Sequence, residues 1–147
     1  MSVEIRDLQA GDRAAWDALY AGYAAFYEVE QTDEMRDRVW GWLMDDAHGV
    51  RGLIAVKGGV AVGLAHTRRF ARPLAAAQGL FLDDLFVSPD GRGARVGEAL
   101  IDAVEAQAKE DGASVVRWIT ADDNYRARGL YDQVAERTMW ITYDREV

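Results

Sequence analysis

The feature that most limits the possible folds is a junction rich in glycine and arginine near the middle of the chain. An apolar segment, Leu80–Val87, runs into a Ser-Pro-Asp-Gly turn and then into Arg92–Leu100, which reads RGARVGEAL. From Val96 onward the apolar residues recur at the spacing of an amphipathic helix. A strand therefore passes through a tight turn into a helix, and this helix leaves its first backbone N–H groups unpaired beside the positive end of its dipole. The junction indicates a mixed α/β fold that binds an anion at this point.

The residues of the turn favour phosphate as the anion. Glycines bring the backbone close to a ligand, and the guanidinium groups of Arg92 and Arg95 match phosphate oxygens. Two familiar motifs are excluded: a dinucleotide fingerprint would need glycine where Val96 stands, and a Walker A loop would need Gly-Lys-Ser/Thr where Gly97-Glu98-Ala99 stands. The plainer alternative, a glycine-rich turn with solubilising arginines, stays open from these residues alone.

Periodicity and turn residues predict the remaining elements. The expected strands are Val3–Arg6, Gly52–Lys57, Val60–Thr67, Leu80–Val87, Ser114–Thr120 and Met139–Tyr143. The first expected helix follows Asp12 and ends at about Tyr27, and the second begins at Thr32. The third runs from Val96 to Asp111-Gly112, and the fourth covers Tyr125–Val134 after the capping residues Asp122–Asn124. The stretch Arg68–Gln78 reads as a loop. The order predicts an α/β fold of the mixed-sheet α+β kind, an antiparallel meander followed by βαβ and a terminal αβ unit, in a single domain over 1–147.

Charge and composition narrow the partners. The formal net charge of −8 disfavours nucleic acid and is compatible with a cationic amine. No apolar run approaches the ~18 residues of a membrane span, and His48 and His66 are too few and too far apart for a metal cluster. The absence of cysteine is typical of a reducing compartment, so we expect a cytoplasmic protein without a metal.

Four segments together carry a family resemblance. Leu82–Pro89, Arg92–Leu100, Trp118–Thr120 and Asn124–Tyr131 resemble the GNAT superfamily of N-acetyltransferases, most closely its polyamine/histone-type amine acetyltransferase branch. The resemblance implies a GNAT-like fold with acetyl-CoA as cosubstrate. The family's coenzyme A loop has the form Arg/Gln-x-x-Gly-x-Gly/Ala, and here Arg95 replaces the inner glycine.

The resemblance also implies a coenzyme site. In the family the strand before the loop splays from its parallel neighbour, and its free backbone groups bind the pantetheine arm and polarise the thioester. Without the resemblance, the apolar residues of this strand would be assigned to the core. A role in the core and a role in binding the coenzyme are compatible. The implied coenzyme-binding residues are Leu85, Phe86, Val87, Arg92, Gly93, Ala94, Arg95, Val96, Gly97, Glu98 and Asn124.

The catalytic candidates are Tyr131, Asp83 and Asp84, and Asn124 is the expected coenzyme contact on the same helix as Tyr131. Asn124 and Tyr131 are seven positions apart on the expected helix and share a face; in the family the tyrosine protonates the coenzyme A thiolate and the asparagine contacts the coenzyme. The alternatives are a helix cap for Asn124 and core packing for Tyr131. Asp83 and Asp84 interrupt an apolar strand, and alternation predicts that they point to opposite faces, so that one meets the substrate cleft. The alternative is a strand-end pair facing water or an arginine.

The substrate wall is expected near the end of the first long helix. Helical spacing makes packing the default for the earlier aromatic residues there, whereas Tyr27 and Glu28, together with Asp83, are the expected contacts to an ammonium group.

The sequence therefore predicts an acetyl-CoA-dependent N-acetyltransferase that moves an acetyl group to a primary amine by direct attack, with Tyr131 protonating the thiolate. The acceptor is a small-molecule or peptide amine. Alternatives are a catalytically inactive acyl-CoA-binding regulatory module, favoured only by Arg95, and another nucleotide-binding fold, disfavoured by both failed motifs. The terminal strand Met139–Tyr143 could pair across a two-fold axis in a homodimer.

Overall fold

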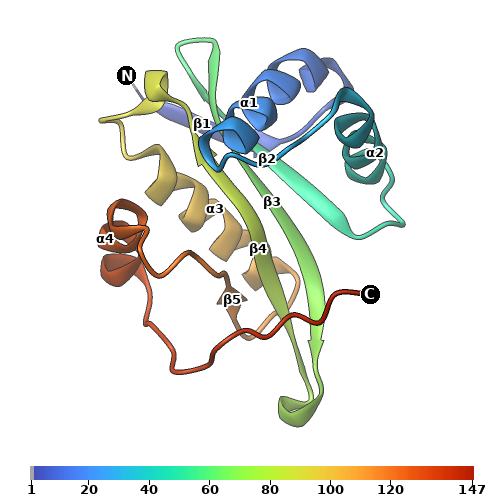
Figure 1. The fold of residues 1–147 in the computed structure, drawn as a ribbon, viewed down its shortest axis with the longest axis vertical. Coiled ribbons are helices and arrows are strands. Elements are labelled where there is room, and N and C mark those ends of the chain that lie inside the picture. The colour runs from blue at the N-terminus through green and yellow to red at the C-terminus, as the bar shows by residue number, and fades with distance from the viewer. Residues whose placement is uncertain (1) are drawn as a thin grey trace.

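The fold is built on one mixed sheet with the strand order β1-β2-β3-β4-β5, in a computed structural model that describes residues 2–147 (Figure 1). The strands are β1 (Val3–Asp7), β2 (Val50–Lys57), β3 (Val60–Arg72), β4 (Ala77–Val87) and β5 (Val116–Arg117). The helices are α1 (Arg13–Phe26), α2 (Asp33–Leu43), α3 (Val96–Glu110) and α4 (Tyr125–Val134). Strands β1 to β4 are antiparallel and β5 joins β4 in parallel, which confirms the predicted mixed α/β class.

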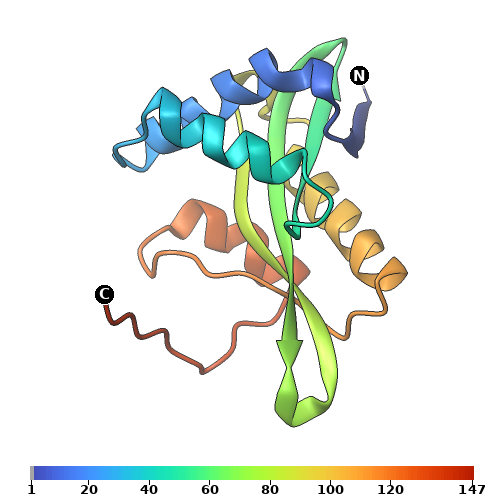
Figure 2. The ribbon, with the colours of Figure 1, turned by 90° about the vertical axis from the view of Figure 1, so that its right-hand side faces the viewer.

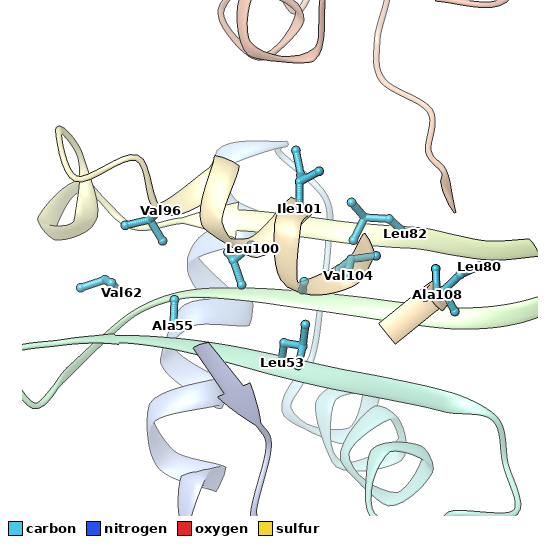
Figure 3. Packing of buried hydrophobic residues seen from close by; sticks show 11 residues of the cluster. Leu53, Ala55, Val62, Leu80, Leu82, Val96, Leu100, Ile101, Val104 and Ala108 are labelled. Atoms are coloured by element: carbon cyan, nitrogen blue, oxygen red, sulfur yellow. The ribbon is translucent and has the colours of Figure 1, made fainter. Parts of the chain in front are cut away.

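Helices cover both faces of the sheet (Figure 2). Helix α3 lies on one face, where its residues at helical spacing meet alternate residues of the strands, as Figure 3 shows. The residues buried there include Leu53, Val62, Leu80, Leu82, Val96, Leu100 and Val104. Helices α1 and α2 cover the other face, where Trp16, Leu19 and Leu43 of the helices cluster with Ile54 and Leu64 of the sheet.

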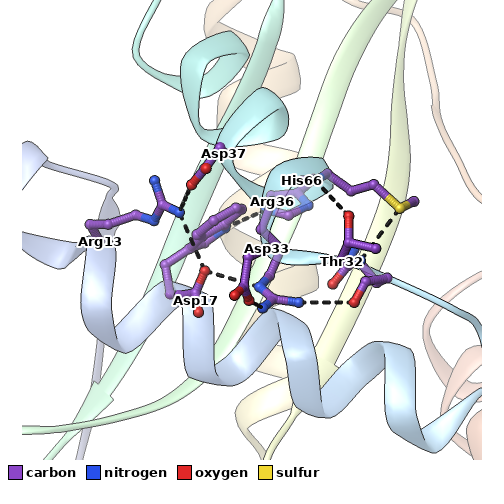
Figure 4. A network of polar contacts seen from close by, with 10 residues as sticks. Arg13, Asp17, Thr32, Asp33, Arg36, Asp37 and His66 are labelled. Carbon is purple, nitrogen blue, oxygen red and sulfur yellow. Dashed lines mark hydrogen bonds and ion pairs between the residues drawn. The ribbon is translucent and has the colours of Figure 1, made fainter.

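The two N-terminal helices are fixed to each other by a polar network (Figure 4). Arg36 of α2 is only 8% exposed and donates to Asp17 of α1 at 3.0 Å and to Asp33. Thr32 caps α2 as predicted, because its hydroxyl accepts a hydrogen bond from the backbone N–H of Met35 at 3.1 Å.

The predicted loop over Arg68–Gln78 is wrong. Strand β3 continues to Arg72 and β4 begins at Ala77, so the two form a long hairpin that projects beyond the rest of the sheet (Figure 2). The arginines of this hairpin find polar partners: Arg69 pairs with Asp111 and Arg72 donates to the hydroxyl of Ser114. Because no core covers the projecting part of the hairpin, its residues do not alternate between apolar and polar. The sequence pattern therefore did not predict strands there.

The C-terminal strands differ most from the prediction. Strand β5 comprises Val116–Arg117 alone instead of Ser114–Thr120, and among the described residues Met139–Tyr143 forms no strand. The chain after α4 extends away from the sheet (Figure 2). A β-pattern needs a hydrogen-bonding neighbour to become a strand. Among the described residues Ser114–Thr120 pairs with β4 only in its first part, and Met139–Tyr143 pairs with no strand.

Candidate active site

The site lies where β4 and β5 separate. In the part of the chain that the structure describes, the two strands pair only at Leu80–Val116 and Phe81–Arg117, and β4 then continues to Val87 without a neighbour on that side. The free edge leaves backbone N–H and C=O groups available to a ligand. A cavity of about 460 Å³ opens beside it. Its walls are Tyr23, Tyr27, Leu82, Asp83, Leu85, Trp118, Ile119, Thr120, Ala121 and Tyr131.

A second cavity, of about 400 Å³, lies at the N-terminus of α3. It is lined by Arg95, Gly97, Glu98, Gly129, Leu130 and Gln133. No side chain of the described residues caps α3, so the backbone N–H groups of its first turn are available to an anion. A Cβ atom on Gly97 would lie 3.2 Å from the side chain of Leu130, so glycine lets α4 approach α3 at this point. Helix α4 borders both cavities, with Leu130 in one wall and Tyr131 in the other.

The loop before α3 holds Arg95 in an unusual backbone conformation. Arg95 has φ 54° and ψ 39°, the left-handed conformation that glycine adopts most easily. Gly93 also has a positive φ, of 84°. Arg92 is exposed, Ala94 is half-buried, and Val96 is buried in the core beneath the loop. The chain therefore keeps the loop shape with an arginine, and places an exposed cation at the mouth of the second cavity.

Tyr131 and Asn124 are both near the first cavity. The Tyr131 ring packs edge-on against Trp118, with centroids 5.4 Å apart, and its hydroxyl-bearing side chain lines the cavity. Burial raises the pKa of Tyr131 to about 12, with a further contribution from Tyr27, so the phenol carries its proton at neutral pH. Asn124 caps α4, accepting from the N–H of Ala127 at 3.4 Å, and donates to the Tyr27 hydroxyl at 3.3 Å. Its cap role is confirmed.

The prediction that Asp83 and Asp84 point to opposite faces is wrong. Asp84 pairs with His66 across β3 and β4, but the next β3 residue, Thr67, pairs with Leu82, which leaves Asp83 as the extra residue of a β-bulge. The two carboxylates contact His66 and Arg68, which are two residues apart on β3 and share a face. Both aspartates therefore face the α1 side of the sheet.

Asp84 belongs to a buried hydrogen-bond chain and does not line the cavity. Trp16 donates through Nε1 to Nε2 of His66 at 2.9 Å, so Nδ1 of His66 carries the proton and donates to Asp84 at 2.8 Å. The Tyr20 hydroxyl donates to the same carboxylate oxygen at 3.0 Å. Burial acts to raise the pKa of Asp84, but the hydrogen bonds from His66 and Tyr20 outweigh it and leave the pKa below its usual value. This chain of hydrogen bonds connects α1 to the β-bulge of β4.

Asp83, unlike Asp84, lines the cavity. Its carboxylate accepts from Nε of Arg68 at 3.0 and 3.1 Å. Burial raises the pKa of Asp83 despite the opposing charge of Arg68. The Arg68 guanidinium lies over the Phe81 ring, 4.5 Å from its centroid, so its position is fixed on two sides.

The other expected contacts divide between cavity and core. Leu85 and Tyr27 line the first cavity, whereas Phe86 points to the α1 face and Val87 packs toward α3. Glu28 follows α1 in a left-handed conformation with φ 55° and is not part of the cavity wall.

Several wall residues were not predicted from the sequence. Tyr23 was assigned to packing, and it does pack on Phe86, with centroids 5.9 Å apart, but it also lines the cavity. Leu82 and Trp118–Thr120 lie in segments that resemble the family, but they were not assigned to the site, and Ala121 was not singled out. Within residues 2–147 no group of three or more His, Cys, Asp or Glu side chains is arranged to hold a metal ion. None of the helices described is long and apolar enough to cross a membrane.

The fold is similar to the folds of solved N-acetyltransferase structures. A ribosomal-protein-alanine N-acetyltransferase from Brucella melitensis superposes with a TM-score of 0.83 at 24% identity, covering 100% of both chains. AAC(6')-Iy, solved with a bisubstrate analogue, CoA-S-monomethyl-acetylneamine, gives a TM-score of 0.83 at 20% identity, covering 100% of this chain and 99% of that one.

The chain belongs to the Acetyltransferase (GNAT) family, whose sequence profile matches residues 16–135. It is similar to the D-amino-acid N-acetyltransferase HPA3 of Saccharomyces cerevisiae, with 28% identity over 145 residues, which is 97% of this chain and 90% of the relative. The family and this relative support an acyltransferase of the N-acetyltransferase type. The polyamine/histone-type branch stays a prediction.

Proposed function

We propose that this protein transfers the acetyl group of acetyl-CoA to a primary amine by direct attack. The observation that carries the proposal is the position of Tyr131. This protonated phenol lines a cavity at the free edge of β4, and the adjacent residue on α4 lines the anion-suited cavity at the N-terminus of α3. A proton donor and a diphosphate site thus lie on the two sides of one helix.

The residues present fit coenzyme A. The backbone N–H groups of Val96, Gly97 and Glu98, with the guanidinium of Arg95, would hold the diphosphate. The free edge of β4 near Leu85 would hydrogen-bond the pantetheine arm and polarise the thioester carbonyl. Tyr131 would then protonate the departing thiolate, and its high pKa keeps the donor proton in place until that step.

The acceptor amine must be neutral to attack, although a free alkylamine has a pKa near ~10.4. Asp83 is the carboxylate in the cavity wall, and we assign it the binding of the ammonium form and the acceptance of its proton, directly or through water. Its raised pKa makes it a better proton acceptor than an exposed carboxylate. The aromatic walls formed by Tyr23 and Tyr27 favour a cation through their ring faces.

The arrangement around Arg68 also favours a substrate that carries a carboxylate near its amine. Nε of Arg68 is engaged by Asp83, while none of the described residues accepts a hydrogen bond from its terminal nitrogens. An amino acid could place its ammonium group on Asp83 and its carboxylate on these nitrogens, the forked geometry that arginine provides. The similarity to a D-amino-acid N-acetyltransferase supports this choice of substrate class.

The test is a screen for thiol release from acetyl-CoA with D- and L-amino acids, polyamines and aminoglycosides. Tyr131→Phe should lower kcat by about 100-fold or more, within the usual contribution of a general acid. Tyr125→Phe is the matched control, because Tyr125 begins the same helix and is 75% exposed. Full activity in Tyr131→Phe removes the phenol from the mechanism. Coenzyme A binding without turnover on any amine supports the inactive acyl-CoA-binding module instead.

Substrate class is tested separately with Arg68→Gln. Each amino acid is compared with the amine that lacks its carboxylate. We expect the variant to lose about tenfold or more in kcat/KM for the amino acid and little for the plain amine. An equal effect on both would show that Arg68 acts only by holding Asp83.

A further inference from the structure

The buried hydrogen-bond chain between α1 and the sheet has no part in the chemistry proposed above. Trp16 is 0% exposed, His66 is 2% exposed and the Asp84 side chain is 19% exposed. Since Nε2 of His66 accepts from the indole of Trp16, the imidazole is neutral, and among the described residues no arginine or lysine pairs with Asp84. A mostly buried carboxylate held by neutral donors costs stability that apolar residues at these positions would not cost. Such a departure from an apolar core is expected where a charge serves a function.

The buried chain reaches the catalytic cavity at two points. The first is the β-bulge, where Asp84 pairs with His66 and the extra residue, Asp83, lines the cavity. The second is Tyr23, another wall residue, because burial and then the charge of Asp84 raise the pKa of its phenol. Tyr20, whose hydroxyl donates to Asp84 at 3.0 Å, stacks on Tyr23 with ring centroids 6.0 Å apart. Asp84 therefore lies behind two wall residues without lining the cavity itself.

We infer that His66 and Asp84 are positioning residues for Asp83. The hydrogen bond from Nδ1 of His66 holds Asp84 on the α1 side of the sheet, and this contact fixes the register in which Asp83 is the bulged residue. Without the bulge, alternation would place the two carboxylates on opposite faces, and only one of them would point to the α1 side. The negative charge of Asp84 also lies beside Asp83 and favours a proton on it. The benefit to catalysis rests on the proposed function, in which Asp83 accepts the proton of the amine.

The groups that face Asp83 act on it in opposite directions. Burial raises the pKa of Asp83, the charge and hydrogen bond of Arg68 lower it, the charge of Asp84 raises it, and a proton on His66 would lower it. The other titratable groups around the two aspartates are phenols, from α1, its C-terminal end and α4: Tyr20, Tyr23, Tyr27 and Tyr131. Phenols are uncharged at neutral pH. The proton affinity of Asp83 therefore depends on Arg68 on one side and Asp84 on the other.

The first test compares two substitutions of His66 that each keep one of its hydrogen bonds. In His66→Asn the amide nitrogen takes the place of Nδ1 and still donates to Asp84, whereas in His66→Gln the amide oxygen takes the place of Nε2 and still accepts from Trp16. Each variant loses one buried hydrogen bond, so urea titration should show similar losses of stability. We expect His66→Gln to lower kcat on the order of 10- to 100-fold with the KM for acetyl-CoA unchanged, and His66→Asn to keep most of kcat. Equal losses of kcat in the two variants, or no loss in His66→Gln, overturn the positioning role.

The second test needs no activity. NMR titration of ¹³C-labelled aspartate carboxyl groups follows Asp83 and Asp84 separately in the free protein. In the wild type we expect Asp84 to ionise at lower pH than Asp83, and in Asp84→Asn we expect the pKa of Asp83 to fall, because the neighbouring negative charge is gone. Asp102→Asn is the matched control, since Asp102 is exposed on α3, which covers the other face of the sheet, and its loss should leave the titration of Asp83 unchanged.

Two results of this titration overturn the inference: Asp83 ionising before Asp84 in the wild type, or an unchanged pKa of Asp83 in Asp84→Asn. The order of ionisation in the wild type decides the matter even if Asp84→Asn does not fold. The expected titration together with a failed acetyltransferase assay would keep the effect of Asp84 on Asp83 and refute only the proposed function.

Discussion

The left-handed conformation of Arg95 leads to a prediction about both stability and coenzyme binding. At φ 54° and ψ 39° a non-glycine residue costs about 1–2 kcal/mol relative to a relaxed backbone. Glycine removes this strain but loses about 0.5–1 kcal/mol through the greater freedom of the unfolded chain. Arg95→Gly should therefore stabilise the fold by about 0.5–1 kcal/mol, which is a rise in Tm of about 1–4 °C for a chain of this size.

The same substitution removes the guanidinium from the anion site. A hydrogen bond to a charged group contributes about 1.5–3 kcal/mol, and solvent at this exposed position reduces that contribution, so coenzyme A affinity should fall about tenfold. Arg95→Ala is the matched control, because it loses the charge and keeps the strain. We expect calorimetric titration to show the same loss of affinity in both variants, and chemical denaturation to show that only the glycine variant gains stability.

Two results would refute this reasoning. Equal stability of the glycine and alanine variants would mean that residue 95 is not held in the left-handed region. Unchanged coenzyme A affinity in both would mean that the arginine does not contact the phosphates.

Three further predictions concern the helix junction, the cap of α2 and the buried carboxylate. Gly97→Val would press a branched side chain against Leu130 and narrow the second cavity, and we expect calorimetry to show coenzyme A affinity at least about tenfold lower. Thr32→Ala removes a side-chain cap and should lower the unfolding free energy by about 1 kcal/mol in a urea titration. The pKa of Asp84 is lowered in the folded protein, so its carboxylate stabilises the fold above its unfolded pKa of about 3.9 and this stabilisation is lost as pH falls through the folded pKa. The stability difference between the wild type and Asp84→Asn should therefore be largest at neutral pH and shrink in acid, and a constant difference would contradict the assigned hydrogen bond from His66.

Elements with a buried face were predictable from the sequence. In helix α3 the apolar residues Val96 and Leu100 recur at helical spacing, and in strand β4 Leu80 and Leu82 recur at strand spacing; all four are buried. The cap at Asn124 was predictable from its residue type at the start of α4. The β3–β4 hairpin was missed because its projecting part has no core to impose alternation. Strand β5 and the segment Met139–Tyr143 were overpredicted. An apolar alternating pattern shows that a segment can form a strand, but it does not show that the same chain supplies a strand to pair with it.

The site was predictable in its parts but not in its assembly. The glycine-rich turn and the residues that resemble the family indicated Tyr131, Asp83 and the loop before α3, and these line the two cavities. The β-bulge was not visible, because one extra residue in β4 depends on pairing with β3 that the sequence does not encode locally. That bulge turns Asp84 toward His66 and leaves Asp83 in the cavity wall, so it separates the two roles.

The most direct test of the central claim is a crystal structure of the protein with coenzyme A. We predict the diphosphate on the backbone N–H groups of residues 96–98 and the thiol in the cavity between Leu85 and Tyr131, within hydrogen-bond reach of the phenol. Coenzyme A bound elsewhere, or a thiol that does not enter this cavity, would contradict it.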